Sequence, residues 1–330
     1  MKIRALVAAL ALSVFQAPAH AAFANLGVLG DSLSDTGNLF ASLSSATFGL
    51  FAEPNEPYFP GRFSNGPVWL DYYKSSHPGV NVGNLAMGGA FSGTINGRDN
   101  AGDDDFGAVP LFGGLLQNAA RGLDSQLPQV PATLPANTAM VLWIGANDIN
   151  NAVSIGFANP QDVVPTSLTN VGNAINLLLA SGASDVYVGN LPDLGRTPSA
   201  AAAGRQADLT AATLDFNNGL VSLAAGAGAR VHVVDIFSSF NALLANAAAL
   251  GFTDTTTPCV DDLFDDTACA DPASHVFWDG VHPTTGVHAL VADVFTAAFE
   301  PAPVPLPGSV WLLVPGVGLL VLRGRRAARA

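Results

Sequence analysis

Four short blocks of polar residues and glycine contain the side chains that could attack an acyl carbonyl and hold the charge that forms on it. They are Gly30-Asp31-Ser32, Met87-Gly88-Gly89, Gly145-Ala146-Asn147-Asp148 and Asp279-Gly280-Val281-His282. A serine at the point where a strand turns into a helix exposes its hydroxyl and points its own N–H toward a developing oxyanion. Asp279 and His282 can share one loop as a carboxylate and a base. Each block alone is also ordinary helix capping or a tight turn, so the prediction depends on their combination.

The elements that must position these blocks follow from the apolar pattern. Strand-like runs cover Asn25–Gly30, Val80–Leu85, Ala139–Ile144, Asp185–Gly189 and Val231–Val234. Helical patterns lie between the later runs, as over Leu209–Ala225, and a final helix is predicted over His288–Phe299. Strands that alternate with helices predict a parallel sheet covered on both faces, with ligands beyond the carboxyl ends of the strands. The irregular residues 40–78 and 92–130 predict loops or lids that shape a groove.

In this order and at these strand ends, the four blocks resemble those of the GDSL or SGNH hydrolase family. That family has a GDS serine, a glycine, a Gly-x-Asn-Asp asparagine and an Asp-x-x-His pair, and the resemblance runs from Gly30 to Pro283. It implies an α/β fold, a three-layer α/β/α sandwich with a flavodoxin-like parallel sheet of five strands. The α/β-hydrolase elbow Gly-x-Ser-x-Gly is disfavoured, because position 34 is Ser.

The resemblance also implies a role for each matching residue. Ser32 is the expected nucleophile, His282 its base and Asp279 the carboxylate that orients the imidazole. The backbone N–H groups of Ser32 and Gly89 and the side-chain amide of Asn147 are the expected oxyanion donors. The implied reaction is hydrolysis of a carboxylic ester through an acyl-enzyme, without a metal or organic cofactor.

Within the family the sequence leaves several activities open, namely lipase, phospholipase, acyltransferase and carbohydrate acetylesterase. Deacetylation of a surface polysaccharide is one hypothesis, and the substrate could equally be a small-molecule or lipid ester. A hypothesis of another class is a surface or matrix binding protein that keeps the fold without turnover. The complete set of Ser32, Asn147, Asp279 and His282 argues against that alternative.

Several residues near these blocks are interpreted as structural. His275 and His288 flank the Asp-x-x-His block, but neither follows an Asp by three residues, which indicates surface or packing positions. Asp31 is expected to organise the turn beside Ser32. The segment from Tyr58 to Trp69 resembles one in secreted lipase-like members and is expected to line one wall of the acyl groove, although a core cluster is an equal alternative.

Cys259 and Cys269 are the two cysteines of the chain, and they lie in an acidic, loop-like stretch. Export to an oxidising compartment would favour a disulfide between them. A zinc site is not expected, because two cysteines without nearby paired histidines supply too few ligands. Aspartates between them could bind calcium, but their spacing departs from the EF-hand and favours a solvated loop; they are Asp261, Asp262, Asp265 and Asp266.

Composition excludes some classes of protein and partner. The 330 residues include 13 Lys and Arg against 26 Asp and Glu, and the hydrophobic content of 49% is that of a folded globule. Six of the basic residues lie in the two tails, so the body carries 7 basic against 26 acidic residues, which argues against a nucleic-acid partner. The body, residues 22–302, has the length of one α/β domain.

The first 21 residues are typical of a secretory signal. Lys2 and Arg4 precede an apolar run, and Ala19-His20-Ala21 has the small-x-small pattern of a cleavage site. The run, Ala5–Phe15, is too short to span a membrane. We therefore expect an exported protein whose mature chain begins near Ala22.

Residues 303–330 combine a Pro-rich linker, a short apolar segment and an Arg-rich end. They resemble the PEP-CTERM sorting signal of Gram-negative bacteria, which would make an exosortase-type enzyme a partner and place the protein at the cell envelope or surface. Leu306 stands where that motif usually has Glu. The alternative is a plain C-terminal membrane anchor, although the apolar segment is short and Pro315 interrupts it.

Overall fold

The computed structural model describes residues 23–50, 52–93, 122–154, 159–261 and 267–300. Within them, residues Phe23–Ala298 form one compact unit. The predicted signal segment, residues 1–21, and the predicted sorting tail, residues 303–330, lie outside the described residues. No helix in the described part of the chain combines the length and the apolar character needed to cross a membrane.

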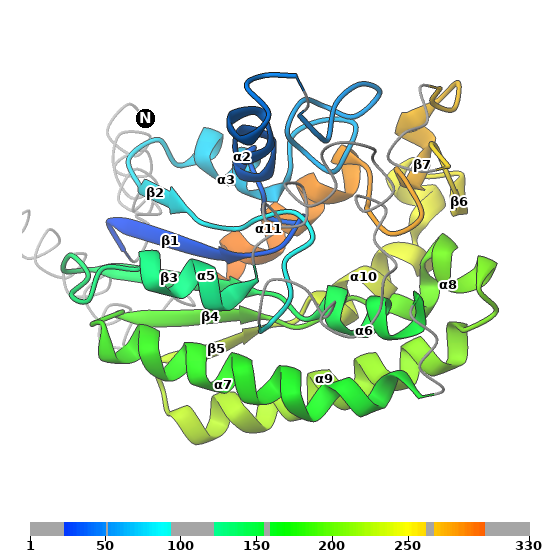
Figure 1. Ribbon diagram of the computed structural model, residues 1–330. Coiled ribbons are helices and arrows are strands. Elements are labelled where there is room, and N and C mark those ends of the chain that lie inside the picture. Colours follow the sequence, from blue (N-terminus) through cyan, green and yellow to red (C-terminus); the bar gives the residue numbers. More distant parts are fainter. Residues whose placement is uncertain (1–22, 51, 94–121, 155–158, 262–266, 301–330) are drawn as a thin grey trace, which may run out of the picture. The chain divides into compact units, whose positions relative to one another are not determined.

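A parallel sheet of five strands forms the centre of the fold (Figure 1). The strands are β1 (Asn25–Gly30), β2 (Asn81–Asn84), β3 (Thr138–Trp143), β4 (Asp185–Gly189) and β5 (Val231–Val234). They lie in the order β2-β1-β3-β4-β5, and each neighbouring pair is parallel. This is the flavodoxin-like order, so the predicted fold class is confirmed. The order reverses between β1 and β3, which is where such sheets bind ligands.

Helices cover both faces of this sheet. They are α2 (Asn38–Ala46), α3 (Trp69–Ser76), α5 (Leu123–Gln126), α6 (Ala146–Ser154), α7 (Val164–Ala180), α8 (Pro198–Ala202), α9 (Gln206–Ala227), α10 (Ile236–Ala245) and α11 (Thr285–Phe299). Figure 1 shows α7 and α9 along one face of the sheet. Their apolar side chains share one core with alternate residues of the strands, including Leu142 and Val188. On the other face, Phe295 of α11 stacks on Trp69 of α3 and contacts Trp143 of β3.

Two parts of the fold differ from the sequence prediction. Residues 40–78 were expected to be loops or lids, but they include most of α2 and all of α3, and α5 lies within 92–130. These helices have four to nine residues, so an apolar period hardly repeats within them. The sequence also gave no sign of a second, two-stranded sheet of β6 (Asp254–Pro258) and β7 (His275–Phe277). β6 is polar and mostly exposed, so it lacks the alternation that marks a strand.

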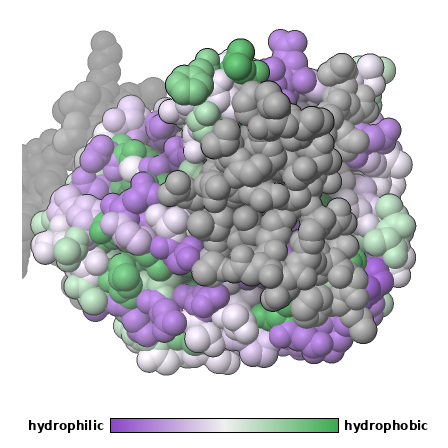
Figure 2. Space-filling view, viewed as in Figure 1, coloured by the Kyte–Doolittle hydropathy of each residue, from purple (hydrophilic) through white to green (hydrophobic). Residues whose placement is uncertain are grey.

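The surface is largely mixed in polarity. On the face shown in Figure 2, hydrophilic and hydrophobic residues are interspersed around the part drawn in grey. The most exposed large hydrophobic side chains among the described residues are Phe48 and Leu50, which follow α2. Single exposed apolar residues of this kind are ordinary on protein surfaces.

Candidate active site

Three of the four predicted blocks lie at the carboxyl ends of neighbouring strands. Ser32 follows β1, Gly89 lies in the loop after β2, and Asn147 is in the first turn of α6 after β3. Parallel strands bring their carboxyl ends to one edge of the sheet, so residues distant in the sequence meet there. The site thus lies at the edge where the strand order reverses.

The fourth block joins this edge through a line of hydrogen bonds. Asp279 and His282 lie in the loop between β7 and α11. The Nε2 atom of His282 lies 2.8 Å from Ser32 Oγ, and its Nδ1 atom lies 2.6 Å from Asp279 Oδ2. The imidazole therefore bridges a hydroxyl and a carboxylate, with geometry suited to moving a proton from the hydroxyl.

Asp279 is buried, with 6% of its surface exposed. Its Oδ1 atom accepts the backbone N–H groups of Val281 and His282 at 2.8 and 2.6 Å. Burial alone would raise the pKa of this carboxyl, but the neighbouring imidazole and these hydrogen bonds outweigh burial and hold the pKa below its usual value. The carboxylate is thus ionised when it faces His282.

Tyr58 supplies a further donor to this carboxylate. Its hydroxyl donates to Asp279 Oδ2 at 2.8 Å, and the Tyr58 ring is buried edge-on against Trp278 at a centroid distance of 5.7 Å. The contact is not visible in the sequence, because the two residues are 221 positions apart and no local spacing connects them. The aromatic density around Tyr58 was the one signal, and it was interpreted as a groove wall or a core.

The segment around Tyr58 supports the His282 loop instead of lining the groove. The Phe63 ring lies 5.0 Å from the His282 imidazole, centroid to centroid. Ser64 Oγ donates to the carbonyl of Pro283 at 2.9 Å, and Asn65 Oδ1 accepts the backbone N–H of Thr285 at 2.8 Å. None of the described residues 58–69 lines the pocket beside Ser32. The contacts therefore favour the core alternative over the groove wall, because the rings of Tyr58 and Phe63 pack against the loop that carries the imidazole.

Three groups were predicted to donate to an oxyanion near Ser32. The backbone N–H groups of Ser32 and Gly89 have no acceptor among the described residues. Gly89 has a φ of 73°, a left-handed conformation that glycine adopts at low cost. The Asn147 amide donates to the carbonyl of Ala90 at 2.8 Å, which uses one of its two N–H bonds and ties it to the glycine loop.

A buried and a half-buried aspartate hold the loops that carry these donors. Asp35 accepts the backbone N–H groups of Gly37, Asn38, Leu39 and Gly88, which fixes the serine loop to the glycine loop. Asp148 accepts the backbone N–H and the hydroxyl of Ser92 and the hydroxyl of Ser167. Burial raises the pKa of both carboxyls. The role of Asp35 was not predicted from the sequence, because no recognisable motif marks its side chain.

Asp31, the neighbour of Ser32, organises the turn as predicted. Its Oδ1 atom accepts the backbone N–H of Leu33 at 3.0 Å. The side chain is buried, and burial raises its pKa to about 7. A carboxyl beside the nucleophile thus titrates near neutral pH.

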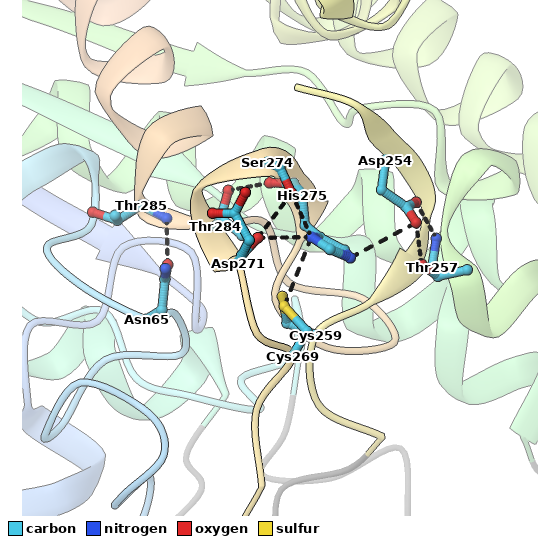
Figure 3. Close-up of a disulfide and its surroundings, with 10 residues drawn as sticks. All are labelled: Asn65, Asp254, Thr257, Cys259, Cys269, Asp271, Ser274, His275, Thr284 and Thr285. Atoms are coloured by element: carbon cyan, nitrogen blue, oxygen red, sulfur yellow. Dashed lines mark hydrogen bonds and ion pairs between the residues drawn. A yellow bond between two sulfur atoms is a disulfide. The ribbon is translucent and has the colours of Figure 1, made fainter. Parts of the chain in front are cut away.

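A disulfide between Cys259 and Cys269 fastens the chain just before Asp279 (Figure 3). The backbone N–H groups of Cys259 and Val260 donate to the carbonyl of Trp278 at 2.9 and 2.8 Å. The bridged segment therefore holds the residue next to Asp279 from outside the main sheet.

The two other histidines of this region are structural, as interpreted from the sequence. His275 lies beside the disulfide, and its Nε2 atom is 3.7 Å from Asp254 Oδ2 (Figure 3). His288 is fully buried, and burial lowers its pKa to about 3.

In the described part of the chain, Cys259, Cys269 and His275 lie close enough together to be considered as metal ligands. The two cysteine sulfurs form a disulfide with each other, so neither is available as a thiolate ligand.

A pocket opens beside Ser32 and His282. On one side its lining is polar, with Asn147, Asn150, Asp193 and Thr197. On the other side it is apolar, with side chains from α10, β7, the His282 loop and α11: Ile236, Phe240, Phe277, Val281, Val287 and Val291. Such a pocket can hold an ester whose carbonyl lies at the serine.

The fold and the site define an enzyme that acts on carboxylic esters. The family model of the GDSL-like lipase/acylhydrolase matches residues 26–295, and the chain belongs to this family. The family resemblance seen in the sequence is thereby confirmed. The match includes all four blocks, from Ser32 to His282.

Individual relatives are similar over most of the chain. A phosphatidylcholine-sterol acyltransferase of Aeromonas hydrophila is 26% identical over 336 residues, which covers 87% of this chain and 93% of that protein. A thermolabile hemolysin of Vibrio parahaemolyticus is 28% identical and covers 80% of this chain and 61% of that protein. Among solved structures, phospholipase A1 from Streptomyces albidoflavus is 14% identical with a TM-score of 0.47, covering 84% of this chain and 100% of that chain.

Proposed function

We propose that this chain is an exported serine esterase or lipase that hydrolyses carboxylic acyl esters through a Ser32, His282 and Asp279 triad. The observation that carries the proposal is the continuous hydrogen-bonded line from Ser32 Oγ through the imidazole to Asp279, with distances of 2.8 and 2.6 Å. Ser32 and His282 at one end of this line also line a pocket with polar and apolar side chains.

The reaction follows from these positions. His282 Nε2 accepts the Ser32 proton while Oγ bonds to the ester carbonyl carbon, and the carbonyl electrons move to oxygen. The N–H groups of Ser32, Gly89 and Asn147 stabilise that oxyanion, and loss of one such donor typically costs about 10²-fold or more in turnover. When the oxyanion collapses, the ester C–O bond breaks and the proton on His282 passes to the leaving alcohol. Water, deprotonated by His282, then cleaves the acyl-enzyme by the same steps in reverse.

The test compares the full chain with its Ser32→Ala variant on p-nitrophenyl acetate, butyrate and palmitate. Ser45→Ala serves as the control, because Ser45 is an exposed serine of α2. We expect turnover by the parent and the control and a loss of about 10³-fold or more in Ser32→Ala. A fluorophosphonate should label the parent and the control but not Ser32→Ala. Equal turnover by folded parent and Ser32→Ala protein would refute the proposed mechanism.

Acyl transfer is the second candidate, and the similarity to the Aeromonas hydrophila acyltransferase favours it. An alcohol can replace water in the second half of the reaction, so that the acyl-enzyme yields a new ester instead of an acid. Incubation of the same protein with phospholipid vesicles, with and without an added sterol, distinguishes acyl transfer from hydrolysis. Sterol ester as the main product would identify a transferase, and free fatty acid a hydrolase.

Export is supported by the signal-type pattern of residues 1–21 and by the disulfide, since such bonds persist in oxidising compartments. The Arg-rich tail supports delivery to the cell envelope. Expression of the full chain in a Gram-negative host, followed by cell fractionation, tests both export and delivery to the cell envelope. Recovery in the cytoplasm with both cysteines reduced would contradict the proposed location.

A further inference from the structure

A second, apolar groove lies next to the pocket beside Ser32. The two cavities share four lining residues, which are Ile236, Phe240, Val287 and Val291. The groove then continues between α10 and α11, where it is lined by Leu243, Leu290, Val294 and Leu250. No charged residue lines it in the described part of the chain, and its two polar side chains are Ser239 and Asn246. Apolar side chains therefore extend from the lining of the pocket beside Ser32 along the groove between the two helices.

The length of this path is set by the two helices. On α10 the lining runs from Ile236 to Leu243, and on α11 from Val287 to Val294. Seven residues of helix rise about 10 Å, which matches an extended acyl chain of about eight carbons. A two-carbon acetyl group would remain beside Ser32 and leave the groove empty.

The two sides of the inner pocket indicate how an ester lies across Ser32. The polar lining comes from α6 and from the segment between β4 and α8, at Asn150, Asp193 and Thr197. The part of the lining that the pocket shares with the groove is apolar and comes from α10 and α11. An acyl chain fits the apolar side, and an alcohol portion with polar groups fits the other side.

We propose that the groove between α10 and α11 binds the acyl chain of the substrate and makes the enzyme selective for esters of about eight carbons over acetate esters. This inference rests on the proposed function, because it assumes acyl transfer to Ser32. Each methylene that leaves water for the groove strengthens transition-state binding by up to about fourfold. Several methylenes together should then raise kcat/KM for octanoate by about 100-fold or more over acetate.

The test measures kcat/KM of the full chain on p-nitrophenyl esters from acetate to dodecanoate. Val291→Trp narrows the junction of pocket and groove, and Ala242→Trp fills the outer groove on α10. Ala245→Trp is the matched control, because this exposed residue of α10 lines neither cavity. We expect the ratio of octanoate to acetate kcat/KM to fall by about tenfold or more in both groove variants and to stay unchanged in the control. Circular dichroism checks that every variant folds.

Two results would overturn the inference, and they are distinguishable. If hydrolysis depends on Ser32 but the parent prefers acetate, or the groove variants keep the parent's ratio, the groove does not bind the acyl chain and the proposed function stands. If no ester is turned over in a Ser32-dependent way, the proposed function fails and the acyl-chain assignment fails with it.

Discussion

The hydrogen bond from Tyr58 to Asp279 makes the clearest prediction about the site. Tyr58→Phe removes the hydroxyl that donates to Asp279 Oδ2 at 2.8 Å and keeps the ring that packs edge-on against Trp278. The same carboxylate oxygen accepts the His282 Nδ1–H, so the substitution frees the atom that orients the imidazole. The two backbone donors to Oδ1 remain.

The size of the effect follows from these contacts. A hydrogen bond to a charged group contributes about 1.5–3 kcal/mol, and about 1.4 kcal/mol corresponds to a factor of ten in rate. Because Asp279 keeps its backbone donors, only part of that energy is lost from the transition state. We therefore expect kcat/KM on p-nitrophenyl butyrate to fall about tenfold, mainly through kcat, with a loss of about 1 kcal/mol in the free energy of unfolding.

Tyr72→Phe is the matched control for this substitution. Its hydroxyl pairs with Thr285 Oγ1 at 2.8 Å at the start of α11, so it also holds this region without contacting Asp279. We expect the control to keep kcat within about twofold of the parent. If folded Tyr58→Phe keeps the parent's kcat/KM, or if the control loses as much, then Tyr58 does not act through Asp279.

Three further predictions concern packing, the disulfide and pH. Gly88→Ala should lower the free energy of unfolding by about 1–3 kcal/mol in urea titrations, because a methyl group there would overlap the ring of Phe63; unchanged stability would contradict this contact. Replacing Cys259 and Cys269 with serine removes a cross-link between positions ten apart and should lower the free energy of unfolding by about 3 kcal/mol, measured as a lower Tm. An unchanged Tm would show that the disulfide does not stabilise the fold. Burial raises the pKa of Asp31 from 3.8 to about 7, so the folded state binds the proton more tightly and stability falls as pH rises from about 4 to 7. Asp31→Asn should flatten this dependence in urea unfolding at pH 5 and pH 8, and an unchanged slope would refute it.

The sequence determined much of the fold because most of the central strands are largely buried. β1, β4 and β5 have the predicted bounds, and β2 and β3 differ by one residue at their ends. Each run ends near a Gly, Asn or Asp, so its limits are visible locally. The strand β6 has no such pattern, since it is polar and mostly exposed, and it was missed.

The residues of the candidate site were also found from the sequence, because each lies in a short block with its own spacing. The order of the blocks and the strands before them were enough to predict these residues, which are Ser32, Gly89, Asn147, Asp279 and His282. Parallel strands bring such blocks to one edge, so topology alone predicts that the first three meet. The hydrogen-bond distances from Ser32 to His282 and Asp279 came from the structure.

Only the tertiary structure decided which buried surfaces face each other. An apolar or aromatic residue in a sequence shows that a side chain is to be buried, but its partner depends on how distant segments pack. Tyr58 therefore meets Asp279 across 221 positions, although its segment was expected to line the groove. For the same reason the apolar groove between α10 and α11 is invisible in either helix alone, because each contributes one wall. The sequence by itself thus predicted the residues around Ser32, and the packing of helices around the sheet decided what supports them and which apolar surfaces lie beside them.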